Sequence, residues 1–309
     1  ILKCAIYKSC ERCHTWFSHF LGHFSSNFCY SCNGLGSGPT CAFLGNLICC
    51  IWNARAFFAV DSDVAAAKRA VLLKLRNCDL ICLQETHEKP GDVARLLYLL
   101  RKSHICFSSC GSADAGGVLC FVHLRISHIF TMTKEILCAA LTLIFDSDVH
   151  GGFTCSNVHL VPRWPFDEKV TLLNKLRALL TSKANYTHWL MGDWNFPIAG
   201  RQRRHGNLVT FQHICGDDIR LNNAWNNSFS EFHMLSPTDF THVAKNESCH
   251  TYANLDRIYS NLSSVVLHVA HPDAKMLADL SKDYCSDHAP VFVRFQPVQS
   301  SRRPVDLPT

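Results

Sequence analysis

The segment His188-Trp189-Leu190-Met191-Gly192-Asp193-Trp194-Asn195 joins a largely apolar run directly to a polar cluster. The run has the length of a short buried strand, and the Gly-Asp pair that follows marks its end. A second segment has the same form, because Leu80-Ile81-Cys82-Leu83 leads into Gln84-Glu85-Thr86. In open α/β sheets the strand ends collect the functional groups, since the strands hold them rigidly and leave them exposed. The two junctions predict an α/β fold with a site at its strand ends.

Two further acidic residues lie in or beside β-prone runs. Asp256 lies within Leu255–Tyr259, and Asp287 shortly precedes the run Val291-Phe292-Val293. Two carboxylates about 4 Å apart repel by roughly 4 kcal/mol at an effective dielectric near 20, so converging acids require a cation or a shared proton. Oxygen and amide ligands favour Mg²⁺, with Mn²⁺ as the alternative, over zinc. The pattern therefore predicts a divalent-cation site among Glu85, Asp193, Asp256 and Asp287.

Amphipathic segments alternate with apolar runs from residue 46 onward, as in a fold that interleaves helices with strands. Helical spacing of apolar residues predicts helices over 62–76, 93–100 and 170–180. The apolar runs predict strands at Asp79–Gln84, Val118–Val122, Ile136–Phe145, Phe153–Val158, His188–Met191, Leu255–Tyr259, Ser264–Val269 and Val291–Phe295. Residues 200–250 are polar and weakly periodic, and they predict long loops with one short helix.

Composition indicates a globular protein, with 48% hydrophobic and 18% charged residues in a chain of 309. The net charge of +5 permits a polyanionic partner without requiring one. The longest apolar runs fall short of the roughly 20 residues of a membrane-spanning helix, and the first residues do not resemble a secretory signal. Many cysteines lie inside apolar runs, where a reduced thiol acts as a small hydrophobe, so we expect a reducing compartment.

The first 45 residues form a Cys- and His-rich extension with few charged side chains. Cys10-x-x-Cys13 and Cys29-x-x-Cys32 have the spacing of a structural zinc site. A stretch this rich in cysteine also produces such pairs by chance. We favour an extension without zinc, in which Cys10, Cys13, Cys29 and Cys32 are not ligands, and we keep the zinc site as the alternative.

Several short motifs together resemble the endonuclease/exonuclease/phosphatase superfamily over residues 46–297, with 298–309 as a C-terminal tail. The motifs occur in the superfamily's order, which makes the set far more specific than any one of them. The resemblance implies a four-layer α/β sandwich, in which two mixed β-sheets pack face to face with helices on the outside. The matching motifs are Trp52-Asn53, Leu83-Gln84-Glu85-Thr86, Asn157-Val158-His159-Leu160, Gly192-Asp193-Trp194-Asn195, Leu255-Asp256-Arg257-Ile258-Tyr259 and Ser286-Asp287-His288-Ala289-Pro290.

The resemblance also implies roles for the matching residues. Glu85 corresponds to the metal-binding glutamate, Asn53 assists it, and Asp287 is an outer metal ligand. Asp256 orients His288, and Asp193 positions or deprotonates the attacking water while Asn195 donates a hydrogen bond to the phosphoryl oxygens. His159 donates to the phosphate or protonates the leaving oxygen. Taken singly, each of these residues would also suit a turn, a helix cap or the core.

A basic run made of Arg201, Arg203 and Arg204 follows Asn195 and would meet nucleic-acid phosphates if it lies beside the site. A solvated charge run is the other interpretation.

Within the superfamily, Pro237-Thr238-Asp239-Phe240-Thr241-His242 followed by Leu255-Asp256-Arg257-Ile258-Tyr259 resembles the endonuclease domain of non-LTR retrotransposons. Arg55 stands where apurinic-site enzymes of the family carry Asp, which argues against a repair enzyme. The resemblance implies a Mg²⁺-dependent, monomeric nuclease that nicks DNA in the nucleus, with no membrane association and unspecified protein partners. The alternatives are another phosphoesterase of this fold, of the RNA deadenylase, sphingomyelinase or inositol phosphatase type, or an inactive partial copy of an element.

Deletion of residues 1–45 tests the two interpretations of the extension. We expect nicking activity to survive, because every motif with a chemical role lies beyond residue 50. Metal analysis of the full chain provides the second readout. About one zinc per chain that disappears in the Cys10→Ser, Cys13→Ser variant would favour the zinc site instead.

Overall fold

A computed structural model describes the chain in segments that cover most of residues 47–262 and the stretch 286–294. The predicted zinc ligands, the predicted strand Ser264–Val269 and the predicted tail 298–309 lie outside the described residues. The described residues are 7–9, 16–18, 47–58, 62–88, 91–109, 116–137, 139–196, 202–205, 208–211, 216–235, 241–245, 250–262 and 286–294.

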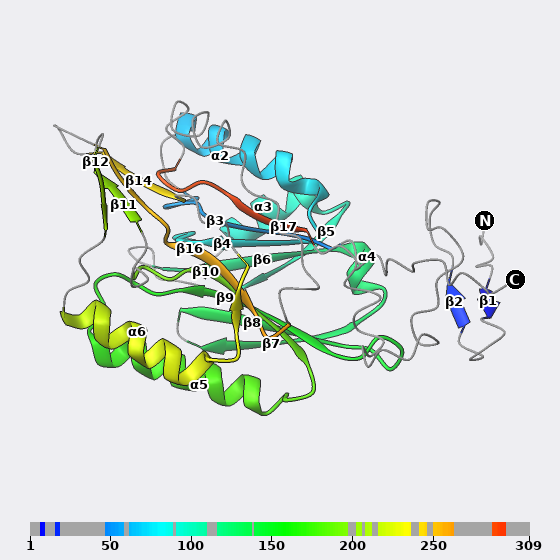
Figure 1. The fold of residues 1–309 in the computed structure, drawn as a ribbon. Helices are drawn as coiled ribbons and strands as arrows, with labels where there is room; N and C mark the ends of the chain where they lie inside the picture. The colour runs from blue at the N-terminus through cyan, green and yellow to red at the C-terminus, as the bar shows by residue number, and fades with distance from the viewer. Residues whose placement is uncertain are drawn as a thin grey trace, which may run out of the picture.

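Two large mixed sheets form the centre of the fold (Figure 1). The five-stranded sheet has the order β17-β3-β4-β6-β5, and the six-stranded sheet has the order β13-β16-β10-β9-β8-β7. The strands of the first are β3 (Ile48–Asn53), β4 (Leu80–Gln84), β5 (His104–Ser108), β6 (Val118–His123) and β17 (Val291–Arg294). Those of the second are β7 (Thr131–Leu137), β8 (Ala140–Asp146), β9 (Phe153–His159), β10 (Thr187–Asp193), β13 (His233–Met234) and β16 (Asp256–Ser260).

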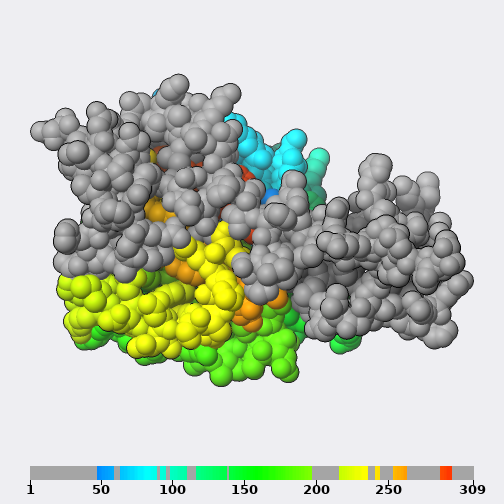
Figure 2. Space-filling view, in the orientation of Figure 1, coloured from blue at the N-terminus to red at the C-terminus, as the bar shows by residue number. Residues whose placement is uncertain are grey.

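Helices cover the outer face of each large sheet, so the chain forms the predicted four-layer α/β sandwich (Figure 1). Helices α2 (Ser62–Lys74) and α3 (Asp92–Leu100) pack on the five-stranded sheet, and α5 (Phe166–Thr181) and α6 (Gly216–Phe229) pack on the six-stranded one. In Figure 2 the surface of α6 and the residues after it, lime to yellow, lies along the lower side. The short helices are η2 (Leu75–Asn77) and α4 (Leu124–Ser127).

Two smaller sheets complete the strand inventory of the described residues. A four-stranded sheet has the order β12-β11-β15-β14 and lies beside the large sheets at the end where the site forms (Figure 1). Its strands are β11 (Gln202–His205), β12 (Leu208–Phe211), β14 (His242–Lys245) and β15 (His250–Ala253), and β1 (Tyr7–Ser9) pairs with β2 (Trp16–Ser18) in the N-terminal extension.

Alternation of side chains along each central strand divides the core into layers. On β4, Leu80 and Cys82 face the other sheet, while Ile81 and Leu83 face the helices. Because both faces are covered, the strand is apolar without interruption, as the sequence predicted. Cys82 lies with its Sγ 3.8 Å from the Sγ atoms of both Cys120 and Cys155, all free thiols at the centre of the core.

Two predictions of secondary structure are wrong. The single strand expected over Ile136–Phe145 is divided between β7 and β8, which pair antiparallel as a hairpin. Residues 200–250 contain α6, fourteen residues long, and several short strands instead of long loops with one short helix. Among the described helices, none combines the length and hydropathy that a bilayer crossing requires.

Asn157 on β9 links the two large sheets through their shared interior. Its side chain is fully buried, and its Nδ2 donates to the carbonyls of Leu83 at 3.0 Å and Leu119 at 2.9 Å. Its Oδ1 accepts a 2.6 Å hydrogen bond from Gln84 Nε2. Buried polar groups are costly unless they are paired, so this set of bonds specifies how the sheets align.

We expect Asn157→Ala to lower the free energy of unfolding by about 3 kcal/mol, because each of three buried hydrogen bonds contributes about 1 kcal/mol. Urea denaturation measures the change. The matched control is Asn174→Ala on the exposed side of α5, for which a change within about 0.5 kcal/mol is expected. Equal effects of the two substitutions would contradict the linking role.

Candidate active site

Strand register brings three of the predicted site residues into one row. Asp193 ends β10, pairs with His159 at the end of the parallel strand β9, and pairs with Asp256 at the start of the antiparallel strand β16. The row crosses three neighbouring inner strands at the end of the six-stranded sheet where β9 and β10 finish. All three side chains are buried, so the polar atoms of each need a hydrogen-bond or charge partner, either from the opposite sheet or from a ligand.

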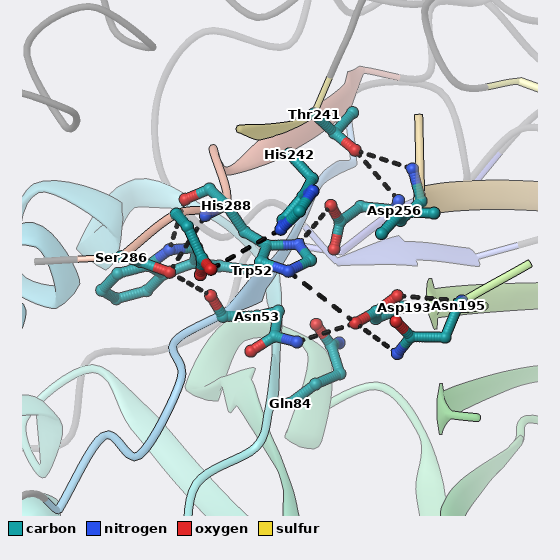
Figure 3. Close-up of polar contacts among 12 residues, drawn as sticks. Trp52, Asn53, Gln84, Asp193, Asn195, Thr241, His242, Asp256, Ser286 and His288 are labelled. Atoms are coloured by element: carbon teal, nitrogen blue, oxygen red, sulfur yellow. Dashed lines mark hydrogen bonds and ion pairs between the residues drawn. The ribbon is translucent and has the colours of Figure 1, made fainter. Parts of the chain in front are cut away.

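The five-stranded sheet supplies the remaining groups at the same edge. Asn53 ends β3, beside Gln84 at the end of the parallel strand β4, and Glu85 follows directly. His288 precedes β17, which runs antiparallel to β3. The indole Nε1 of Trp52 donates to the His288 carbonyl at 3.2 Å, so the Trp52-Asn53 motif holds the histidine's backbone. Figure 3 shows the groups from both sheets pointing toward one another.

Asn53 links the site residues of the five-stranded sheet to those of the six-stranded sheet. Its Nδ2 donates to Asp193 Oδ2 at 2.7 Å and to Glu85 Oε1 at 3.1 Å. Its Oδ1 accepts from the Arg55 backbone N–H at 2.9 Å. In this arrangement the amide nitrogen, and not the oxygen, faces the carboxylates, so Asn53 acts here as a bridge between the acidic groups.

The Asp193–Asn195 turn is shaped by its backbone. A Cβ on Gly192 would lie 1.8 Å from the Val158 carbonyl oxygen, so only glycine lets β10 approach β9 this closely. Asn195 has φ of 47°, in the left-handed region that asparagine tolerates. Its backbone N–H and its Nδ2 donate to the two oxygens of Asp193 at 3.0 and 2.8 Å. This geometry orients the Asp193 carboxylate and keeps Asn195 beside it.

His288 and Asp256 form a buried pair at the centre of the site (Figure 3). His288 Nδ1 lies 2.8 Å from Asp256 Oδ2, and its Nε2 lies 4.0 Å from Asp193 Oδ2. Burial alone would lower the pKa of His288, but the charge and hydrogen bond of Asp256, with Asp193 beyond it, raise that pKa to about 10. The imidazole is therefore charged at neutral pH. Thr241 Oγ1 accepts the Asp256 N–H at 3.0 Å and fixes the carboxylate's strand.

Burial also raises the pKa of the Asp193 carboxyl, and the charge of His288 partly offsets this effect. A carboxylate with a raised pKa is a stronger base than an exposed one.

Glu85 and His159 meet from opposite sheets. His159 Nε2 lies 3.1 Å from Glu85 Oε1, a close approach without hydrogen-bond alignment, and neither ring nitrogen of His159 has a hydrogen-bond partner among the described residues. Burial alone would raise the pKa of Glu85, but the His159 imidazole and the Asn53 amide lower it to about 2. Glu85 is consequently ionised at neutral pH, with φ of 50° that turns it away from the strand and into the site.

The donor set fits a hard divalent cation. Glu85, His159 and Asp193 offer ligand atoms within 4.8 Å of one another, and Asp193, Asp256 and His288 form a second such group. Asp256 Oδ1 and Asp287 Oδ1 are buried oxygens without a hydrogen-bond partner among the described residues. Carboxylate oxygens concentrated in this way suit Mg²⁺ or Mn²⁺, with Glu85 as the residue that would hold the ion.

The other predicted residues have different surroundings. Asp287 forms an ion pair with Arg55 and lies 3.5 Å from His242 Nε2. Arg203 and Arg204 belong to β11 of the four-stranded sheet rather than to a loop, and Arg201 lies outside the described residues. No role was predicted for His242 or Ser286, although both lie in motifs quoted above. Ser286 Oγ donates to the Asn53 carbonyl at 2.7 Å and accepts from the His288 N–H at 3.2 Å.

The common end of the two sheets thus combines buried acids that suit a divalent cation with a charged histidine that suits an anion, the groups that metal-assisted hydrolysis of an ester uses. Residues 50–288 match the family described as the Endonuclease/Exonuclease/phosphatase family. The chain belongs to this family, as the ordered motifs predicted. A search of curated proteins finds no match.

Solved structures with similar folds include the following three proteins. Zebrafish (D. rerio) TDP2 with a single-stranded DNA product has a TM-score of 0.55 and 15% identity, over 81% of this chain and 98% of that one. The endonuclease domain of TRAS1, a telomere-specific non-LTR retrotransposon, has 0.53 and 12%, over 82% and 100%. The human nocturnin catalytic domain has 0.53 and 16%, over 84% and 96%. At these identities the likeness establishes the fold.

The charged His288 should give stability a specific pH dependence. The pKa of histidine is near 6.5 in the unfolded chain and about 10 here, so the stabilisation is fully present below pH 6.5 and is lost as pH rises toward 10. We therefore expect His288→Asn to destabilise the protein more at pH 6 than at pH 10, as measured by urea denaturation. The exposed His128→Asn should leave the pH profile of the parent unchanged. A His288 effect independent of pH would contradict the charged pair.

Proposed function

We propose that the protein is a Mg²⁺-dependent endonuclease that nicks DNA as part of a non-LTR retrotransposon. The observation that carries the proposal is the meeting of Glu85, Asp193 and the Asp256–His288 pair at one end of both sheets. Such a cluster suits the hydrolysis of a phosphodiester, whose transition state gathers negative charge and needs a positioned water. A nuclear location is part of the proposal.

The chain's own residues account for most of the reaction. Asp193, oriented by Asn53 and Asn195, positions the attacking water and accepts its proton as the new oxygen–phosphorus bond forms. The second N–H of the Asn195 amide, which has no partner among the described residues, and the charged His288 stabilise the phosphoryl oxygens as their charge increases. A divalent ion held by Glu85 supplies Lewis-acid stabilisation of the phosphate and leaving oxygen when bound.

His159 is the residue placed to serve the leaving oxygen. It lies on the Glu85 side of the cluster, across from His288, and its ring nitrogens have no hydrogen-bond partner among the described residues. A buried imidazole next to a carboxylate is suited to donate a proton or a hydrogen bond to a departing oxygen.

DNA is the proposed substrate for two reasons. The motif resemblance at residues 237–259 is to retrotransposon endonucleases, and two proteins of similar fold are described with DNA or as an endonuclease domain. Fold alone does not select a substrate, and nocturnin shares it to the same degree. Deadenylase, sphingomyelinase and inositol phosphatase substrates, and an inactive partial copy, are therefore the alternatives that an assay must separate.

Incubation of the purified protein with supercoiled plasmid tests the proposal. We expect open-circular product in Mg²⁺ and none in EDTA, because the clustered carboxylates need a cation to act on a phosphate. The Asp193→Asn variant should lower turnover about a thousandfold, since it removes the base while keeping the side chain's shape. Polyadenylated RNA, sphingomyelin and an inositol phosphate form the comparison panel.

The matched control is Asp148→Asn, at an exposed position in the turn before β9 and thus at the opposite end of that strand from His159, which should cleave like the parent. Thermal unfolding of each variant verifies the fold. Nicking that persists in EDTA would refute the metal-dependent mechanism, and preferred hydrolysis of another substrate in the panel would reassign the function.

A further inference from the structure

Asp287 contacts an arginine and a histidine side chain at the rim of the site. Its carboxylate forms an ion pair with the Arg55 guanidinium, and its Oδ2 lies 3.5 Å from His242 Nε2. The three residues come from distant segments, after β3, at the start of β14 and before β17. We call Arg55, His242 and Asp287 the rim triad. None of them is required by the steps assigned above.

The backbone of Arg55 is held firmly although its side chain is exposed. Arg55 has φ of 41°, and its N–H donates to Asn53 Oδ1 at 2.9 Å. The Nζ of Lys68, a residue only 2% exposed on α2, donates to the carbonyl of Arg55 and to that of Ala56 at 3.0 Å. Burying a lysine to bind two carbonyls costs free energy, so the loop's shape is strongly specified.

His242 is held against the catalytic segment. Its backbone forms an antiparallel bridge with His288, and the Val243 N–H donates to the Asp287 carbonyl at 2.8 Å. The His242 ring centroid lies 4.6 Å from that of His288 (Figure 3). The rim triad therefore lies directly beside His288, the residue proposed to contact the reacting phosphate.

Exposure separates the rim triad from the reacting centre. The Arg55 side chain is 65% exposed, whereas the side chains of Asp193 and His288 are 0% and 6% exposed. Among the described residues Arg55 donates from its side chain only to Asp287, through one terminal nitrogen, and since a guanidinium has five N–H donors, most of them face no described partner and suit a ligand. A group outside the buried centre would meet the part of a substrate that extends beyond the bond being cleaved.

We propose that Arg55 and His242 bind the DNA phosphate next to the scissile one, with Asp287 as the residue that positions both. This inference rests on the proposed function and extends it to substrate contacts. Arginine suits a phosphate through paired N–H donors, and an imidazole beside it adds a further donor. The two contacts would set the register of the DNA strand over Asp193 and His288.

A cycle of substitutions in protein and substrate tests the contact. The substrate is an oligonucleotide duplex with a mapped cleavage site, in which the neighbouring phosphate is replaced by a neutral methylphosphonate. We expect this replacement to lower kcat/KM about tenfold for the parent and far less for Arg55→Ala, because the charge-assisted hydrogen bond is already gone. Arg55→Ala should raise KM more than it lowers kcat, and Arg55→Lys should recover part of the loss.

Two further variants locate the effect. His242→Ala should reduce the same coupling between protein and methylphosphonate, and so should Asp287→Asn, which keeps the side chain's size but weakens its hold on Arg55 and His242. The matched control is Arg177→Ala, which breaks an exposed ion pair with Glu231 on the outer helix layer. Its response to the methylphosphonate should equal the parent's. The proposal is wrong if the free-energy losses in kcat/KM from Arg55→Ala and from the methylphosphonate are additive, because additivity means that the two groups do not interact.

A binding measurement separates failure of this inference from failure of the proposed function. In the Asp193→Asn background, the logarithm of DNA affinity is measured against the logarithm of salt concentration. Arg55→Ala should reduce the slope by about 0.9, the value for one phosphate contact on duplex DNA. A reduced slope without nicking by the parent would refute only the nuclease, whereas an unchanged slope would refute the phosphate contact.

Discussion

The face-to-face packing of the two large sheets is the constraint on which the site depends. Asn53 and Glu85 come from the five-stranded sheet, while Asp193 and Asp256 come from the six-stranded sheet, so neither holds a complete set of functional groups. The interior between them is packed with apolar side chains and linked by Asn157. Since packed interiors deform little, the separation of the two halves is set before any substrate arrives.

Charge compensation decides which groups can be buried at this edge. Asp256 is balanced by His288, and Asp193 is satisfied by amide donors from Asn53 and Asn195. Glu85 keeps its charge through His159 and Asn53. The result is a cluster that is stable as a fold but still rich in carboxylate oxygen, and this is the condition under which a divalent cation or a phosphate finds oriented partners.

The sequence predicted those parts of the fold whose information is local. The strands ending at Gln84 and Asp193 are apolar runs that stop at polar residues, and their site residues follow within one or two positions. The β7–β8 hairpin escaped detection because Ile136–Phe145 contains no Gly or Pro to mark a turn. Helix α6 is rich in asparagine, a weak helix former, although Leu221, Trp225 and Phe229 recur at helical spacing and offered a usable signal. The pairing of Arg55 with Asp287 joins residues 232 positions apart, and no local pattern specifies such a contact.

The place of β17 in the topology has a consequence for synthesis of the protein. His288 and β17 follow all the other described strands of the two large sheets in sequence, yet β17 pairs with β3, the first strand of the five-stranded sheet. A ribosome extends a chain by about 5–20 residues per second, and the intervening strands can pair while the later ones are still being made. The histidine that completes the buried pair with Asp256 joins only after residue 294 has left the exit tunnel. A nascent chain would therefore hold many of its strand pairs while the Asp256–His288 pair is still incomplete, and the site would be finished only by the closing strand.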